Sequence, residues 1–210
     1  MNVDDLQEHW QRAYRNSENE LSWHQSSPEP SLSLVTEAAA SHASAIIDIG
    51  GGASHLVDHL VQRGYSNVTV LDLSATAFAQ AQARLGERAA DVTWIVADIA
   101  DWDAPANRYD VWHDRATFHF MVSDDARSAY LARLKRALVP GGYAIIATFD
   151  LNGPEKCSGL PVLRYDPPAL GRTLGPDYTL ITSAPHCHRT PWGVEQPFQF
   201  SVFRRQPESA

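Results

Sequence analysis

The chain has 210 residues, of which 44% are hydrophobic and 20% charged, and its formal net charge at pH 7 is −8. This length and composition predict one well-buried globular domain, and the negative charge disfavours a nucleic-acid partner. We expect a cytoplasmic protein that does not bind a membrane. No stretch reaches the length of a membrane span, the acidic start is unlike a signal peptide, and the two cysteines make no disulfide framework.

Two helices are predicted before the first strand. The first, over residues 4–16, carries Trp10 and Tyr14 on one helical face. A turn-prone segment with two prolines, residues 26–30, precedes the second helix, over residues 31–42.

The first strand, over residues 46–49, ends in an unusual glycine turn. Asp48 lies near the end of this apolar run, and three consecutive glycines follow it, namely Gly50, Gly51 and Gly52. Apolar residues at helical spacing come next, so the stretch reads as strand, tight turn and helix. Such a unit binds a nucleotide-like ligand at the carboxyl edge of a sheet, where a Cβ would block the approach to the backbone.

The rest of the chain alternates between strands and helices. Strands are predicted over 68–72, 92–96, 108–112 and 143–149, with helices over 75–85 and 124–138 among them, and then a short helix near 169–174 and strands over 178–182 and 198–203. This alternation predicts an α/β fold with a mostly parallel sheet.

The glycine turn fits one nucleotide-binding pattern better than another. A dinucleotide fingerprint would place His55 at its third glycine, where close helix–strand packing leaves no room for a side chain. Asp48, Gly50 and Gly52 fit an acidic-x-G-x-G pattern instead, and Ser54 stands where a third glycine often follows. In these residues the chain resembles the class I S-adenosylmethionine-dependent methyltransferases.

The resemblance covers about residues 45–205 and implies both fold and cofactor. The implied fold is Rossmann-like, a mostly parallel seven-stranded sheet with helices on both faces. The implied cofactor is S-adenosyl-L-methionine, which leaves as S-adenosyl-L-homocysteine. We expect residues 31–210 to form this domain and residues 1–30 to form a helical cap or lid.

Three acids at strand ends, Asp48, Asp72 and Asp98, form a predicted cofactor site. Asp72 lies 20 residues past the last of the three glycines, a spacing that places its carboxylate beside a ribose. The resemblance implies that Asp98 faces the adenine amino group, with the Ile99 backbone reading the ring. It also implies that Leu73 packs against the adenine or the ribose.

The segment after the fourth strand carries the predicted catalytic residues His113, Asp114 and Arg115. Its loop faces the ligand crevice in an open α/β sheet. The Asp114-Arg115 pair resembles the one at this place in thiopurine S-methyltransferases, while an ion pair that only holds the loop is the alternative. His113 and His119 are candidate bases, and we expect His119 also to contact substrate.

Other candidate substrate contacts come from two further segments. Trp10, Tyr14 and Trp23 can wall the substrate if residues 1–30 close as a lid, although aromatic side chains at helical spacing also suit a docked helix. Cys157 lies in an insert rich in glycine and proline after the fifth strand, where the crevice opens. With no C-x-x-C pair near Cys157 or residues 186–188, we expect no metal site and interpret 186–192 as a link between the last two strands.

The predicted function is methyl transfer to a small molecule, with a thiol, sulfide or related chalcogen as nucleophile. A thiolate needs little activation, whereas an alcohol needs a base and an ammonium must first lose a proton. A protein lysine N-methyltransferase is the first alternative. A non-catalytic S-adenosylmethionine-binding sensor or partner subunit is the second. The protein is expected to be a monomer or a homodimer.

Overall fold

The computed structural model describes residues 3–15 and 20–207. The strands of its main sheet are β1 (Ile46–Ile49), β2 (Val68–Asp72), β3 (Val92–Val96), β4 (Tyr109–Arg115), β5 (Leu138–Phe149), β8 (Tyr178–Arg189) and β9 (Glu195–Arg205). The α-helices are α1 (Val3–Ala13), α2 (Ser31–Ala38), α3 (Leu56–Gln62), α4 (Ala75–Leu85), α5 (Asp124–Ala137) and α6 (Pro167–Leu174). Short elements complete the fold, namely the hairpin β6 (Lys156–Cys157) and β7 (Leu160–Pro161) and the 3-10 turns η2 (Gly86–Asp91) and η3 (Phe118–Phe120).

The main sheet has seven strands in the order β3-β2-β1-β4-β5-β9-β8. The strands β1 to β5 pair in parallel, whereas β9 is antiparallel to both β5 and β8. Parallel neighbours put their carboxyl ends at one edge, and the register sets Asp48 of β1 opposite His113 of β4. The predicted Rossmann-like fold is confirmed.

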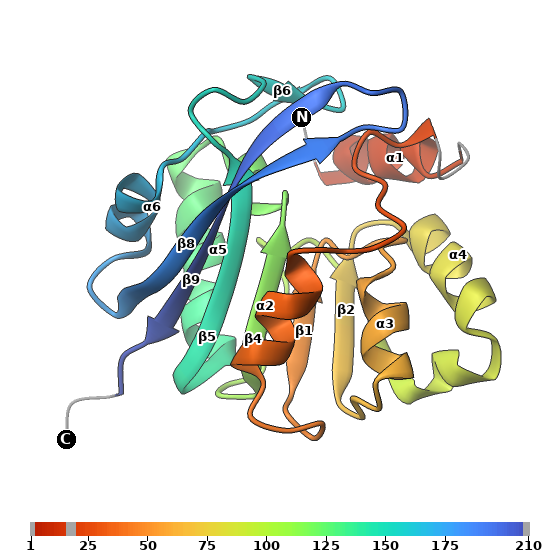
Figure 1. The fold of residues 1–210 in the computed structure, drawn as a ribbon, viewed down its shortest axis with the longest axis horizontal. Helices are drawn as coiled ribbons and strands as arrows, with labels where there is room; N and C mark the ends of the chain where they lie inside the picture. The colour runs from red at the N-terminus through yellow and green to blue at the C-terminus, as the bar shows by residue number, and fades with distance from the viewer. Residues whose placement is uncertain (1–2, 16–19, 208–210) are drawn as a thin grey trace.

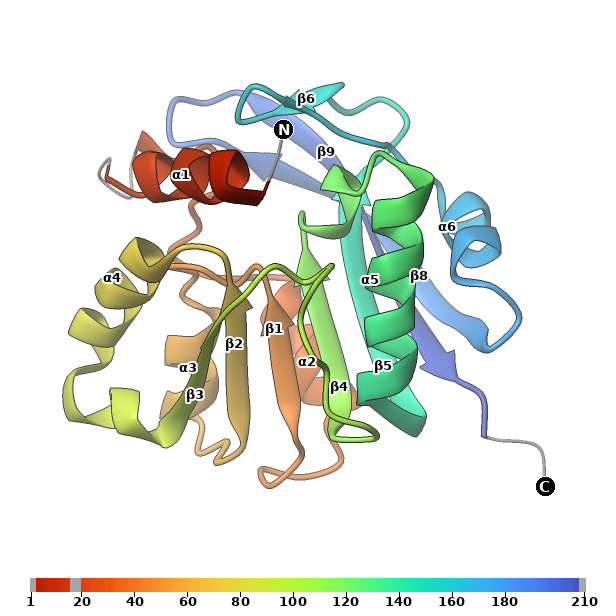
Figure 2. The ribbon, with the colours of Figure 1, turned by 180° about the vertical axis from the view of Figure 1, so that it is seen from behind.

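Helices cover both faces of the sheet (Figures 1 and 2). Alternate residues of β1 show why: Ile46 packs into the core under α2 and α3, and Ile47 packs into the core under α5 and α6. Strands buried on both faces are apolar along most of their length. None of the helices described here is long and apolar enough to cross a bilayer.

The N-terminal segment lies above the carboxyl ends of the parallel strands, close to the β6–β7 hairpin (Figure 1). Helix α1 contains no buried residue and is held by polar side chains. The Gln7 amide donates to the Leu73 carbonyl at 3.2 Å, and the Gln11 side-chain oxygen accepts from the Thr76 amide at 3.0 Å. Residues 1, 2 and 16–19 of the expected lid lie outside the described part of the chain.

Several predicted boundaries are wrong. Strand β4 continues to Arg115, strand β5 already starts at Leu138, and helix α2 ends at Ala38. The interpretation of 186–192 as a link is also wrong, because β8 continues to Arg189 along β9. Strand β8 lies at the sheet edge with mostly exposed side chains, so no hydrophobic alternation marks its length.

Candidate active site

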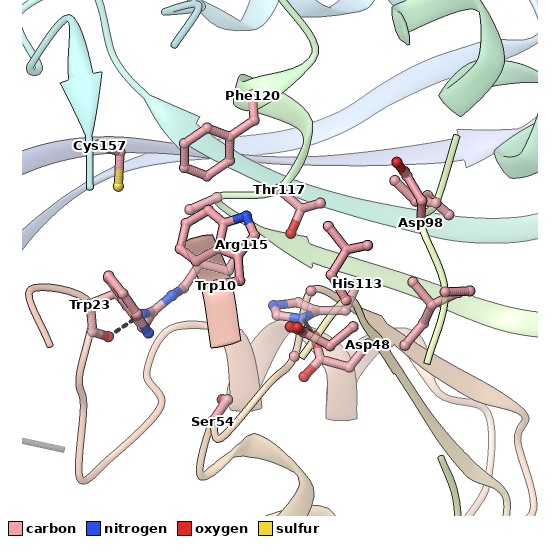
Figure 3. A pocket seen from close by; sticks show the side chains of 18 of the residues that line it. Trp10, Trp23, Asp48, Ser54, Asp98, His113, Arg115, Thr117, Phe120 and Cys157 are labelled. Carbon is pink, nitrogen blue, oxygen red and sulfur yellow. Dashed lines mark hydrogen bonds and ion pairs between the residues drawn. The ribbon is translucent and has the colours of Figure 1, made fainter. Parts of the chain in front are cut away.

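A cavity opens at the carboxyl edge of the sheet, beneath α1, with about 1040 Å³ of space including solvent at its mouth. Thirteen of the predicted site residues line it: Trp10, Tyr14, Trp23, Asp48, Gly50, Gly51, Asp72, Leu73, Asp98, Ile99, His113, Arg115 and Cys157. In Figure 3, Asp98 lies at one end of this group and Trp23 and Cys157 at the other, with Asp48 and His113 between them. The predicted residues Gly52, Asp114 and His119 do not line the cavity.

The glycine turn is closely packed by other side chains of the protein. Gly50 and Gly52 have φ of +64° and +49°, in the left-handed region that favours glycine. A Cβ on Gly50 would lie 1.9 Å from the Thr117 hydroxyl oxygen, and one on Gly52 would lie 2.2 Å from the Tyr14 hydroxyl oxygen. Protein packing therefore requires both glycines, and Gly52 does not line the cavity, so its contact with a ligand stays a prediction.

Asp72 is a buried carboxylate on the cavity wall. Burial raises the pKa of Asp72 to about 7. The Ser74 amide donates to the Asp72 Oδ1 at 2.7 Å, and this hydrogen bond lowers the pKa. The negative charge of Asp48 raises the pKa further. Added hydroxyl donors would favour the ionised form. The Asp98 Oδ1 accepts a hydrogen bond from the Ala100 amide at 2.8 Å. Two carboxylates at neighbouring strand ends thus fit the ribose and adenine ends of a nucleoside cofactor.

His113, Asp48 and Ser31 form a buried hydrogen-bonded chain. The His113 Nδ1 lies 2.6 Å from the Asp48 Oδ1, and its Nε2 lies 2.8 Å from the Ser31 hydroxyl oxygen. These three residues are 2–3% exposed. Both ring nitrogens have protein partners, so His113 has no nitrogen available to take a proton directly from a substrate.

Asp114 lies behind the cavity, so the prediction of a catalytic contact is wrong. Its carboxylate accepts from the Thr117 amide at 2.8 Å, the Phe118 amide at 3.0 Å and the Tyr130 hydroxyl at 2.7 Å. Burial raises its pKa to about 6, and these hydrogen bonds oppose the rise. Asp114 therefore holds the turn that places Thr117 on the cavity wall.

Arg115 points to the opposite side of β4 from Asp114, as neighbours on a strand must. Its guanidinium donates to the Trp23 carbonyl, so the alternative of an Asp114–Arg115 ion pair is wrong. Burial lowers the pKa of Arg115 to about 10, a value at which it remains a cation at neutral pH.

Aromatic rings form much of the remaining wall. The ring of Trp10 meets those of Trp23 and Phe120 edge-to-face, at centroid distances of 5.8 and 5.3 Å, and the Tyr14 ring packs 5.8 Å from Trp23. This geometry is favourable for aromatic pairs. The predicted aromatic wall is therefore present, and Figure 3 shows Trp10 between Arg115 and Phe120.

His119 and Cys157 differ in their access to the cavity. His119 is fully buried behind it, against Phe120 and Phe149, and burial lowers its pKa to about 3. The prediction that His119 contacts substrate is wrong. Cys157 lines the cavity, and burial raises its pKa to about 11, so it is a neutral thiol near pH 7.

Several cavity residues escaped the sequence prediction, including Leu6, Ser31, Thr117, Phe120 and Met121. Thr117 and Phe120 fall in the stretch that already held the candidate catalytic residues, so a signal existed for them. Ser31 had none, because its role comes from the approach of α2 to β4. Among the described residues, no group of three or more His, Cys, Asp or Glu side chains could hold a metal ion.

Comparison with known proteins gives one family and several relatives. Residues 46–142 match the family model described as a methyltransferase domain. A 2-heptyl-1-hydroxyquinolin-4(1H)-one methyltransferase of Mycobacteroides abscessus is 29% identical over 169 residues, which cover 74% of this chain and 73% of the relative.

Two solved structures share the fold. One was studied for the conversion of a disulfide bond into a thioacetal group during echinomycin biosynthesis; it superposes with a TM-score of 0.78 at 24% identity over 97% of this chain and 94% of its own. The other is the 1,6-didemethyltoxoflavin-N1-methyltransferase of Burkholderia thailandensis, with its substrate and S-adenosylhomocysteine bound. It superposes with a TM-score of 0.74 at 20% identity over 97% of this chain and 88% of its own. The matched segment holds the glycine turn, Asp72, Asp98 and β4, so the predicted cofactor residues lie in the part of the chain that is similar to a methyltransferase domain.

Proposed function

We propose that the protein methylates a small molecule that carries a thiol, sulfide or related chalcogen, with S-adenosylmethionine as methyl donor. The observation that carries this proposal is the cation Arg115 in an aromatic-walled cavity. A guanidinium there favours an anionic acceptor such as a thiolate and disfavours the ammonium of a lysine side chain.

The cofactor residues take distinct roles in this proposal. Asp72 accepts the ribose hydroxyls, Asp98 and Ile99 meet the adenine, and Leu73 packs against the nucleoside. Gly50 and Gly51 offer bare backbone to the amino-acid end, beside Asp48. When bound, the cofactor would supply a methyl group on a cationic sulfur. The nucleophile would bond to the methyl carbon while the sulfur leaves in line as a neutral thioether.

The chain's own contribution is positioning and desolvation. Trp10, Trp23 and Phe120 exclude water from the acceptor, which strengthens charge interactions in the cavity. Arg115 keeps an acidic acceptor ionised, so no base has to touch it. This account requires no proton transfer to His113, whose nitrogens are both occupied.

A second candidate acceptor is an acidic hydroxyl on a flat aromatic ring. The Mycobacteroides relative is named for a hydroxyquinolone, and the rings of Trp10, Trp23 and Phe120 suit a planar ligand. Oxygen and sulfur acceptors share the need for an anion near Arg115, so the choice between them requires a product assay.

Labelled S-adenosylmethionine tests the proposal against three panels: small thiols with sulfide, hydroxylated heteroaromatics, and a whole-cell protein extract. Label in a thioether product would support the first choice, and label in an aryl ether would support the second. Label in a protein band would favour the lysine methyltransferase. Cofactor binding without any product would favour the non-catalytic sensor or partner subunit.

A further inference from the structure

Arg115 is half-buried on the cavity wall and has few protein partners among the described residues. A guanidinium carries five N–H donors, and the hydrogen bond to the Trp23 carbonyl is the interaction found for it among residues 3–15 and 20–207. No carboxylate of these residues lies within 4.0 Å of it. Other arginines have such partners, since Arg84 pairs with Asp58 at 2.9 Å and Arg164 with Glu155 at 3.1 Å. A ligand in the cavity would bury this cation further, and a buried cation is costly unless the ligand supplies a counter-charge.

The surroundings of Arg115 do not neutralise it. Its charge helps to lower the pKa of His186 and His188, for which burial is the larger cause, and both histidines are therefore neutral near pH 7. Cys157 faces it as a neutral thiol. Asp48 exerts the strongest favourable charge effect on Arg115, but its Oδ1 already binds His113. This corner of the cavity, at Arg115, Cys157 and Trp23, is therefore electropositive.

We propose that Arg115 is the recognition point for a carboxylate of a bound ligand. The planar fork of a guanidinium matches the two oxygens of a carboxylate, and the described residues accept a hydrogen bond from only one of its five donors. The inference rests on the proposed function, because the same cavity holds cofactor and acceptor. Two ligands can bring the carboxylate: the amino-acid end of the cofactor, or an acceptor that carries its own acid group.

Calorimetry with Arg115→Gln distinguishes these sources. If the cofactor supplies the carboxylate, the variant binds S-adenosylhomocysteine roughly 10- to 100-fold more weakly, the usual range for a charged hydrogen bond. Its affinity for 5′-methylthioadenosine, which lacks the amino-acid end, stays within about twofold. If the acceptor supplies it, both nucleosides keep their affinity, and the preference for thiosalicylate over thiosalicylamide disappears instead.

Two further variants control the measurement. Arg115→Lys keeps the charge but loses the fork, so we expect an intermediate loss. Arg164→Gln removes a guanidinium that Glu155 already pairs, outside the cavity lining, and should change no affinity. If Arg115→Gln does not fold, the wild-type protein still decides the question, since the carboxylated member of one ligand pair must bind at least about tenfold more tightly.

Equal weakening of charged and neutral ligands by Arg115→Gln, or no weakening of either, would overturn the inference. So would a wild-type protein without preference in both ligand pairs. These results leave methyl transfer itself intact as long as S-adenosylhomocysteine binds, but they remove Arg115 as the reason for an anionic acceptor. Failure of the wild-type protein to bind either nucleoside would contradict the proposed function itself, while the thiosalicylate pair would still test Arg115.

Discussion

At the scale of single residues, two aspartates near strand ends differ in what surrounds them. Asp72 is buried on the cavity wall, whereas Asp101 is exposed after β3. We expect Asp72→Asn to weaken S-adenosylhomocysteine binding about tenfold or more, because an amide accepts ribose hydroxyls less strongly than a carboxylate. Calorimetry measures this, with Asp101→Asn as the matched control. Equal affinity in wild type and Asp72→Asn would refute the ribose assignment.

A second prediction concerns how the stability of the fold depends on pH through His119. Burial lowers the pKa of His119 to about 3, and neither of its ring nitrogens has a hydrogen-bond partner in the described part of the chain. The unfolded chain binds a proton near pH 6.5 and the folded chain does not, so stability is lost as pH falls below 6.5. From pH 7 to pH 5 this loss amounts to about 2 kcal/mol. We expect His119→Phe to abolish it.

Urea unfolding of both proteins at pH 7 and pH 5 measures this difference. Asp72 and Asp114 have raised pKa values, about 7 and 6, and they stabilise the fold as pH falls. Their effect is common to both proteins and cancels in the comparison. A stability difference between wild type and variant that does not change with pH would mean that folding does not lower the pKa of His119.

Side-chain roles set the limit of prediction from sequence at this scale. Asp48, Asp72 and Asp98 all line the cavity, because the carboxyl ends of parallel strands meet at one edge of the sheet, as the strand pattern of the sequence predicts. Asp114 lies behind the cavity because β4 continues past Trp112 and turns alternate side chains to opposite faces, and His119 is buried behind the cavity in the 3-10 turn η3. A shift of one residue along a strand moves a polar side chain from the ligand-facing side to the core-facing side. The hydrophobic pattern of the sequence does not determine the position of the strand end to one residue.

At the scale of elements, α1 covers the cavity through few contacts. The Gln11 side-chain oxygen accepts hydrogen bonds from the Thr76 amide and the Ser74 hydroxyl, and these bonds connect α1 to the start of α4. We expect Gln11→Ala to loosen α1, raise the KM for the acceptor severalfold and speed hydrogen exchange of the α1 amides. The global stability should change little, since α1 has no buried residue.

A matched control lies on the same helix. Arg12 is exposed, and its ion pair with Glu8 spans 3.9 Å, so Arg12→Ala should leave the KM and hydrogen exchange unchanged. Normal kinetics in Gln11→Ala together with faster exchange would show that α1 docks on the domain without acting as a lid.

The elements themselves were predicted well where periodicity was strong. Strands β2 and β3 match their predicted spans, and the Ser74 hydroxyl caps α4 by accepting a hydrogen bond from the Ala77 amide. The β6–β7 hairpin and the length of β8 were missed. Both depend on pairing between segments rather than on burial, and pairing leaves no periodic signature in an exposed strand.

At the scale of the whole molecule, the sheet, the N-terminal segment and the β6–β7 hairpin meet at one cavity. Residues from the first 31 positions, from the matched domain and from β6 all line it. Ligand in the cavity should therefore stabilise the entire fold, since binding to the native state alone shifts the unfolding equilibrium.

We expect S-adenosylhomocysteine at 100 times its Kd to add about 2.7 kcal/mol and to raise the Tm by roughly 5–11 °C for a chain of this size. Asp72→Asn at the same ligand concentration should show about half that shift, because a tenfold weaker Kd leaves about 1.4 kcal/mol. Differential scanning calorimetry with and without ligand measures both shifts. A full Tm shift in the variant would mean that Asp72 does not contribute to cofactor binding. No Tm shift in either protein would mean that the cavity does not hold the cofactor.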